Sequence, residues 1–190
     1  MSARRVLLLG APGAGKGTQA EILTRRLGVP KISTGDMLRE AVARGTEVGR
    51  TARGYMDRGE LVPDEVVIAV ARERLGQDDV REGFVLDGFP RTVEQARALD
   101  RMLEQLGVRL EACVTLRVDE DALVERLLSR ADIEGRSDDN EETIRNRMRV
   151  YREQTEPLVA YYREQGLLRD VDGMGSVEEV AKRLEGALSA

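Results

Sequence analysis

The chain has 190 residues, a formal net charge of −5, 41% hydrophobic residues, no histidine and a single cysteine. This length and composition fit one domain with an aliphatic core, and the acidic balance argues against a nucleic-acid or anionic-membrane partner. The missing histidines and the lone cysteine exclude histidine-based catalysis, an intrachain disulfide and a four-ligand Cys/His zinc site, and the lack of a signal peptide or membrane-length apolar run predicts a cytoplasmic protein.

Short apolar runs that alternate with helical patterns predict five buried strands. The predicted strands are Val6–Leu9, Lys31–Ser33, Phe84–Leu86, Ala112–Val118 and Leu168–Val171. This alternation is typical of an α/β protein in which helices cover both faces of a parallel sheet. Ligands on such sheets bind at the carboxyl ends of the strands, and the motifs described next all follow strands directly.

The first motif is a glycine-rich run, Gly10–Thr18, that follows the first strand and precedes helical apolar spacing. A strand, a glycine-rich turn and a helix form the context of a phosphate-binding P-loop. Its backbone N–H groups surround phosphate oxygens, and Lys16 adds a mobile positive charge. The usual pattern has Ser or Thr directly after the lysine, whereas here Gly17 precedes Thr18. This variant resembles the nucleoside monophosphate kinases.

The second strand leads into Ser33–Arg39. We expect Thr34 or Asp36 to cap the helix that starts here, because both side chains can accept a hydrogen bond from an early helical N–H group.

Two segments do not look like core layers, namely 33–62, which contains several glycines, and the polar stretch 131–140. Both are suited to movable flaps.

The third strand ends at Asp87. A carboxylate at the end of a strand beside a P-loop can hold Mg2+ through water. Gly88 permits a ligand to approach the backbone, and Arg91 projects from a turn that Pro90 stiffens. Thr92 is suited to cap the following helix.

Cys113 lies in an apolar strand pattern and is interpreted as a small core residue.

Further along the chain, three arginines are notable for their positions on helices. Arg126 and Arg130 are four residues apart on one helix face, where like charges repel unless they share an anionic partner. In the next long helix, Arg147 lies beside Val150 and away from the arginines of the solvated face, so we expect it to face the cleft.

Gly10–Thr18, Ser33–Arg39 and Asp87–Arg91 with Gln95, in this order and spacing, resemble the adenylate kinases over nearly the whole chain. The resemblance implies reversible transfer of a phosphoryl group, ATP + AMP ⇌ 2 ADP, by a monomer that uses Mg2+ and no zinc. It implies a three-layer α/β/α nucleoside monophosphate kinase fold with a five-stranded parallel sheet. The resemblance also implies a single P-loop kinase domain, 1–190, with three parts. The core comprises 1–32, 63–130 and 141–190, the AMP-binding flap comprises 33–62, and the short lid comprises 131–140.

The resemblance also implies roles for individual residues. Residues at ATP-binding positions are Gly13, Ala14, Gly15, Lys16, Gly17, Thr18, Arg126, Arg130 and Gly175. Residues at AMP-binding positions are Thr34, Arg39, Glu60, Leu61, Val62, Gly88, Phe89, Pro90, Arg91, Gln95, Arg136 and Arg147. The catalytic set is Lys16, Arg91, Arg126, Arg130, Arg136 and Arg147, with Asp138 and Asp139 orienting the lid arginines. Mg2+ would lie near Thr18 and Asp87, held through water.

Two alternatives remain beside this interpretation. A UMP/CMP kinase would share the fold and the chemistry but take a pyrimidine acceptor. Thr34 and Gln95 favour adenine, because a glutamine amide can pair with the adenine edge. A P-loop regulatory switch would need no second nucleotide site, and Gln95 together with the Ser33–Arg39 segment argues against it.

Overall fold

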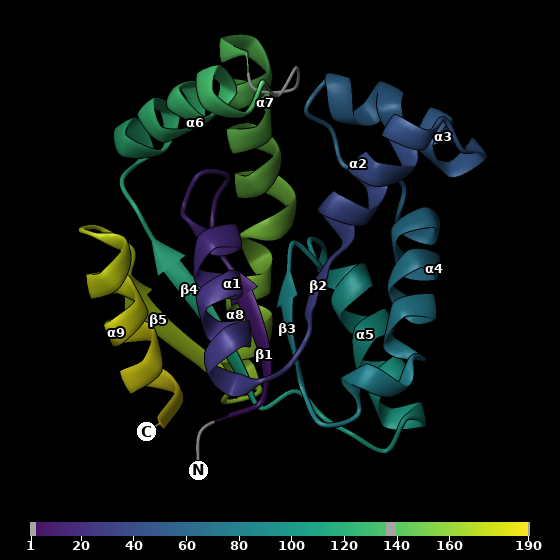
Figure 1. Cartoon of the computed structure of the whole chain (residues 1–190), viewed down its shortest axis with the longest axis vertical. Coiled ribbons are helices and arrows are strands. Elements are labelled where there is room, and N and C mark those ends of the chain that lie inside the picture. The colour runs from purple at the N-terminus through teal and green to yellow at the C-terminus, as the bar shows by residue number, and fades with distance from the viewer. Residues whose placement is uncertain (1–2, 136–139, 190) are drawn as a thin grey trace.

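The computed structural model describes residues 3–135 and 140–189. In this part of the chain, a five-stranded parallel sheet with the order β2-β3-β1-β4-β5 forms the centre (Figure 1). Every strand lies within one residue of its predicted bounds, so the prediction of a parallel α/β fold is confirmed. The strands are β1 (Arg5–Leu9), β2 (Lys31–Ser33), β3 (Phe84–Asp87), β4 (Ala112–Arg117) and β5 (Leu168–Asp172).

Helices connect successive strands. Between β1 and β2 lies α1 (Lys16–Leu27), and between β3 and β4 lies α5 (Val93–Gln105). The segment between β2 and β3 contains α2 (Thr34–Arg44), α3 (Glu47–Asp57), α4 (Asp64–Leu75) and the short η1 (Asp78–Val80). The segment between β4 and β5 contains α6 (Glu120–Glu134), α7 (Glu141–Val150), the π-helical η2 (Tyr151–Thr155) and α8 (Pro157–Glu164). Helix α9 (Val177–Ser189) follows β5. None of the described helices has both the length and the apolar character needed to cross a bilayer.

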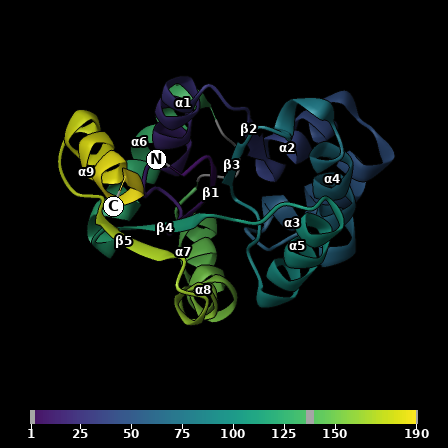
Figure 2. The same cartoon turned by 90° about the horizontal axis from the view of Figure 1, so that it is seen from below.

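The core lies on both faces of the sheet, because successive side chains of a strand point to opposite faces. Leu7 belongs to a buried cluster with side chains of α4, α5 and α8, whereas Leu8 belongs to a second cluster with α1, α6, α7 and α9. Figure 2 shows α1 and α8 on opposite sides of the strands. The three-layer arrangement is therefore confirmed, and Cys113 is buried in the first cluster as predicted.

Two parts of the chain rise above the carboxyl ends of the strands. Helices α2 and α3, at the upper right of Figure 1, make up most of the segment 33–62. Helix α6 and the start of α7 lie at the upper left. The candidate site lies between these two parts, because residues of both α2 and α6 line the cleft beside the P-loop.

Side-chain caps fix where the helices of this region begin. Thr92 caps α5 as predicted, since its hydroxyl accepts a hydrogen bond from the Gln95 N–H at 3.2 Å. The prediction that Thr34 or Asp36 caps α2 is wrong: the Ser33 hydroxyl accepts from the Asp36 N–H at 3.3 Å. A capping residue needs an extended backbone, which Ser33 has as the last residue of β2, whereas Thr34 is already helical.

Candidate active site

The loop between β1 and α1 has the backbone geometry of an anion site. Gly13 and Gly15 have φ values of 84° and 94°, a region that favours glycine. Helix α1 then starts at Lys16 with no side-chain cap and no acidic residue in its first turn, unlike α2, α5 and α7. Its first N–H groups and its dipole therefore favour an anion. The Lys16 ammonium donates to the Gly10 carbonyl, which holds this side chain over the loop.

A cleft in front of this loop, here called the polar cleft, is lined by all residues from Gly13 to Thr18. Its charged lining residues within the described chain are Lys16, Glu21, Lys31, Asp36, Arg39, Asp87, Arg91, Arg126, Arg130 and Arg147. Seven of these are basic and three are acidic, although the whole chain carries a net charge of −5. The positive charge is thus concentrated where a polyphosphate would bind.

The positive charge of the cleft affects the pKa of Lys16. Burial lowers the pKa of Lys16 to about 8, and the guanidinium groups of Arg91, Arg147 and Arg130 contribute to the lowering, while Asp87 opposes it. An anion placed among these cations would favour the charged form of the lysine. The cleft is therefore electrostatically prepared for phosphate groups.

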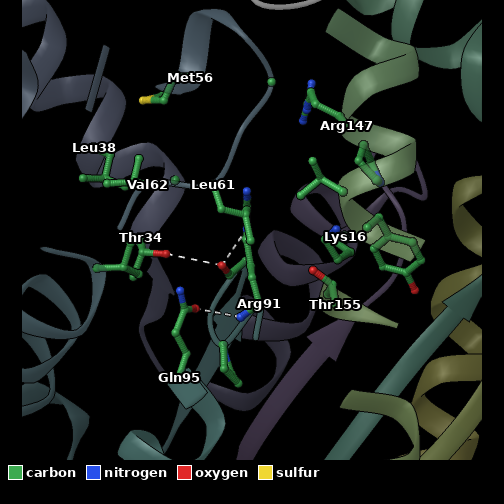
Figure 3. Close-up of a pocket in the computed structure, with 18 of the residues that line it drawn as sticks. Lys16, Thr34, Leu38, Met56, Leu61, Val62, Arg91, Gln95, Arg147 and Thr155 are labelled. Carbon is green, nitrogen blue, oxygen red and sulfur yellow. Dashed lines mark hydrogen bonds between the residues drawn. The ribbon is translucent and has the colours of Figure 1, made fainter. Parts of the chain in front are cut away.

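A second cavity, here called the apolar cavity, lies next to the polar cleft. Both are lined by Lys16, Arg91 and Arg147, so the two spaces adjoin at these side chains. One wall of the apolar cavity consists of aliphatic side chains from α2, α3, α4 and the segment between α3 and α4: Leu38, Met56, Leu61, Val62 and Val67. Figure 3 labels the first four of these residues. Thr34, Arg39, Glu60, Gly88, Pro90 and Gln95 also line it. Such a cavity suits a flat base whose phosphate reaches the basic cleft.

Hydrogen bonds hold the polar end of the apolar cavity. Gln95, only 1% exposed, accepts from the Arg91 N–H at 2.8 Å and donates to Asp64 Oδ1 at 2.7 Å. Thr34 Oγ1 and Arg91 Nε both donate to the Gly88 carbonyl, at 3.4 and 2.9 Å (Figure 3). One amide hydrogen and one lone pair of Gln95 remain for a ligand.

The guanidinium of Arg91 lies where several charges meet. Burial and the neighbouring Arg39 lower the pKa of Arg91, and Asp87 and Asp36 oppose that shift. Arg39 itself pairs with Asp36 at 3.5 Å. The two arginines thus lie together at the junction of the two spaces, which favours a shared anion.

Arg147 reaches the same junction from α7 and lines both the polar cleft and the apolar cavity. The other arginines of α7 and the arginine of the adjoining η2 form exposed ion pairs: Arg145 with Glu141, Arg149 with Glu153 and Arg152 with Glu120. This difference follows the helical periodicity, and the predicted orientation of Arg147 toward the cleft is confirmed.

Arg126 connects the P-loop to the loop after β5. Its guanidinium donates to the Gly13 carbonyl at 3.4 Å and to the Gly173 carbonyl at 3.3 Å. Gly175 lies in the same loop with a φ of 108°, and an ideal Cβ there would lie 2.5 Å from Glu179 Oε2. Arg126 therefore holds together the two loops to which the resemblance assigns ATP contacts.

Some predicted site residues lie elsewhere. Phe89 is fully buried in the core and lines neither the polar cleft nor the apolar cavity, so its AMP-binding role stays a prediction. Arg136, Asp138 and Asp139 lie outside the described residues, and their roles stay predictions. Burial raises the pKa of the Cys113 thiol, consistent with a core residue and not a reactive one.

Sequence reasoning missed part of the apolar cavity. Leu38 had a usable signal, since it follows Thr34 by four residues and therefore lies on the same face of α2. Tyr151 and Thr155 of the π-helical segment also line the cavity. Asp64, the partner of Gln95, carried no signal because the contact joins two different helices.

Known proteins resemble this chain over almost its full length. A family model described as adenylate kinase matches residues 8–167. A protein named adenylate kinase from Thermobifida fusca is 56% identical over 186 residues, which is 98% of both chains. Relatives from Synechocystis, named adenylate kinase 1, and from Thermus thermophilus, named adenylate kinase, are 55% and 54% identical over 183 residues, with 96% of each chain covered. The chain therefore belongs to the adenylate kinase family.

Proposed function

We propose that this chain transfers a phosphoryl group reversibly between ATP and AMP, forming two molecules of ADP. One observation carries the proposal: a basic cleft at a P-loop shares lining residues with an adjoining apolar cavity that has a glutamine amide at its polar end. A hydrolytic switch needs only the first space, whereas a transferase with two nucleotides needs both. Family membership supports the same reaction.

The two spaces support a separate place for each substrate. The ATP phosphates would bind the N-terminus of α1 and Lys16, and AMP would place its base in the apolar cavity and its phosphate near Arg39 and Arg91. Arg147 lines both spaces and would neutralise the charge that develops on the transferred group. The acceptor is an ionised phosphate oxygen, so this reaction requires in-line positioning and positive charge and no general base. A chain without histidine can supply both.

The residues beside the P-loop fit a magnesium ion that accompanies ATP. Asp87 Oδ2 would lie 3.7 Å from an ideal Cβ on Gly17, so this carboxylate faces the P-loop, and Thr18 lines the same cleft. Carboxylate and hydroxyl oxygens are ligands that Mg2+ accepts, together with phosphate oxygens and water. Within the described residues, no group of three or more Asp, Glu, Cys or His side chains is placed so that it could hold a metal ion. When bound, Mg2+ would offset the negative charge of the phosphates.

We further propose that residues 33–62 and 131–140 move as flap and lid around a rigid core. Transfer to AMP instead of water requires that water be excluded from the reacting phosphates. A bisubstrate ligand, two adenosines joined by a polyphosphate, should slow hydrogen exchange in both segments. Protection limited to the P-loop would contradict a second nucleotide site.

The choice of acceptor is tested directly by measuring ADP formation from ATP with AMP, UMP or CMP. We expect AMP to be preferred by several orders of magnitude in kcat/KM, because a pyrimidine leaves buried polar groups unpaired at roughly 1–3 kcal/mol each. Gln95→Ala should raise the KM for AMP strongly and that for ATP little. If UMP or CMP serves as well as AMP, a pyrimidine kinase is the correct assignment.

The composition of the chain and its resemblance to the adenylate kinases together support further properties. The chain would act as a cytoplasmic monomer without zinc, and its lid would close through Arg130, Arg136, Asp138 and Asp139. Elemental analysis tests for bound zinc, and size-exclusion chromatography tests whether the chain is a monomer. One tightly bound equivalent of zinc would contradict the short-lid interpretation.

A further inference from the structure

The amide of Gln95 is held between two partners of opposite hydrogen-bonding character. Its Oε1 accepts from the main-chain N–H of Arg91 at 2.8 Å, and this N–H can only donate. Its Nε2 donates to Asp64 Oδ1 at 2.7 Å, and a carboxylate oxygen can only accept. The assignment of oxygen and nitrogen is thus set by the surroundings. Rotation of the amide by 180° would oppose two acceptors on one side and two donors on the other.

The fixed direction of this amide has a consequence for the base that it meets. The remaining N–H of Gln95 suits an acceptor such as N1 of a 6-aminopurine, and its remaining lone pair suits the exocyclic amino group. A 6-oxopurine presents the opposite pattern, an N1–H donor beside an oxygen acceptor. Only the rotated amide would match it, and this site disfavours the rotated amide.

Asp64 lies behind Gln95 as seen from the cavity. It is the first residue of α4, and the described residues that line the apolar cavity include Gln95 but not Asp64. The Thr92 hydroxyl also donates to Asp64 Oδ1, at 3.3 Å, while it accepts from the Gln95 N–H. The start of α4 is thereby tied to the first turn of α5, from which Gln95 points toward Thr34 and Arg91 (Figure 3).

We propose that Asp64 is a positioning residue that fixes the direction of the Gln95 amide and so makes the acceptor site select 6-aminopurine over 6-oxopurine nucleotides. The inference rests on the proposed function, since it requires that AMP be the acceptor. The specificity of the acceptor site arises partly from repulsion. The site excludes inosine monophosphate because accommodating this nucleotide would place the Gln95 carbonyl against the Asp64 carboxylate.

The test is Asp64→Asn, which has nearly the same shape. An asparagine can accept from Gln95 or, after its own rotation, donate to it, so one of the two barriers to the rotated amide disappears. The ratio of kcat/KM for AMP to that for inosine monophosphate should fall by about tenfold or more, the equivalent of about 1.4 kcal/mol. The KM for ATP should change little. Asp64→Ala removes the same acceptor and should lower the ratio in the same direction.

Glu65→Gln is the matched control. Glu65 is the next residue in the first turn of α4 and is exposed, so this change removes the same charge from the same helix end without touching Gln95. It should leave the AMP preference unchanged. A folded Asp64→Asn protein, verified by its melting temperature, whose AMP preference stays within about twofold of the unchanged chain would overturn the proposal. A uniform loss of kcat for every acceptor would also overturn it, because that result indicates only a structural role.

Failure of the proposed function would look different. If the unchanged chain does not form ADP from ATP and AMP, the function itself is wrong, whatever the variants do. If the unchanged chain prefers AMP and Asp64→Asn keeps that preference, the function stands and the role of Asp64 is wrong.

Discussion

Gly59 offers a test of how tightly the segment 33–62 must fit against α7. This residue follows α3 with a φ of 71° and lines the apolar cavity. An ideal Cβ at this position would lie 2.9 Å from Arg147 Cγ and 2.9 Å from the Thr143 carbonyl oxygen. Gly59→Ala therefore has two effects, backbone strain in the left-handed region and overlap with α7. Gly45 is the matched control, since its φ is 66° and an added Cβ there would meet nothing within 4 Å.

The two effects can be separated by magnitude. Gly45→Ala should lower the free energy of unfolding by about 1–2 kcal/mol, the cost of a left-handed backbone at a residue with a Cβ. Gly59→Ala has the same strain and adds about 1–3 kcal/mol for overpacking against helix backbone. In a chain of this size each kcal/mol lowers the melting temperature by about 2–4 °C. Denaturant unfolding of both variants measures the difference.

The kinetic consequence follows from the Arg147 contact. If α3 and α7 separate to admit the methyl group, Arg147 moves relative to the reacting phosphates, and a shift of about 1 Å can cost about 100-fold in rate. We expect Gly59→Ala to lower kcat by about 10–100-fold and Gly45→Ala to change it little. Equal losses of stability in the two variants, with normal kcat for both, would refute the reasoning.

Three further predictions concern the ATP side. Lys16→Met should lower kcat by about 100- to 1,000-fold with little change in melting temperature, because it removes one preorganised charge at the phosphates; a variant that keeps most of its activity would show that this loop does not bind the donor. The pKa of Lys16 is about 8, so kcat/KM for ATP should fall as the pH rises through 8 and the ammonium loses its proton. The value of kcat should be maintained to higher pH, because bound phosphates favour the charged form of the lysine. A flat kcat/KM profile up to about pH 9.5 would contradict this expectation. Arg126→Met removes both hydrogen bonds that join the P-loop to Gly173 and should raise the KM for ATP more than that for AMP; an equal rise for both substrates would count against its assignment to the ATP side.

Features that depend on neighbours along the chain could be predicted. The P-loop was recognisable because a strand, its glycine turn and the following helix are contiguous, and Thr92 was recognisable as a cap because a cap bonds three residues ahead. The orientation of Arg147 followed from the helical period, which places it opposite the ion-paired arginines. The family resemblance added the substrate assignments of individual residues, which no periodicity indicates.

Ser33 shows where local reasoning stops. Ser33, Thr34 and Asp36 are all good capping residues, and only the point at which β2 ends decides which one has the extended backbone of a cap. That end depends on the pairing of β2 with β3, since Ser33 is opposite Asp87 in the ladder. Pairing with a strand about fifty residues away thus determines which of these neighbouring residues caps α2.

The amino-acid sequence by itself determined the parallel sheet, the phosphate loop and the side chains available to the site, because apolar period and turn chemistry act over a few residues. Only the tertiary structure decided how those side chains are oriented. Asp64 and Gln95 are 31 residues apart on α4 and α5, and they meet because these helices pack together on one face of the sheet. Gly59 meets Arg147 for the same kind of reason. Such contacts depend on packing between elements, whose geometry no local pattern encodes.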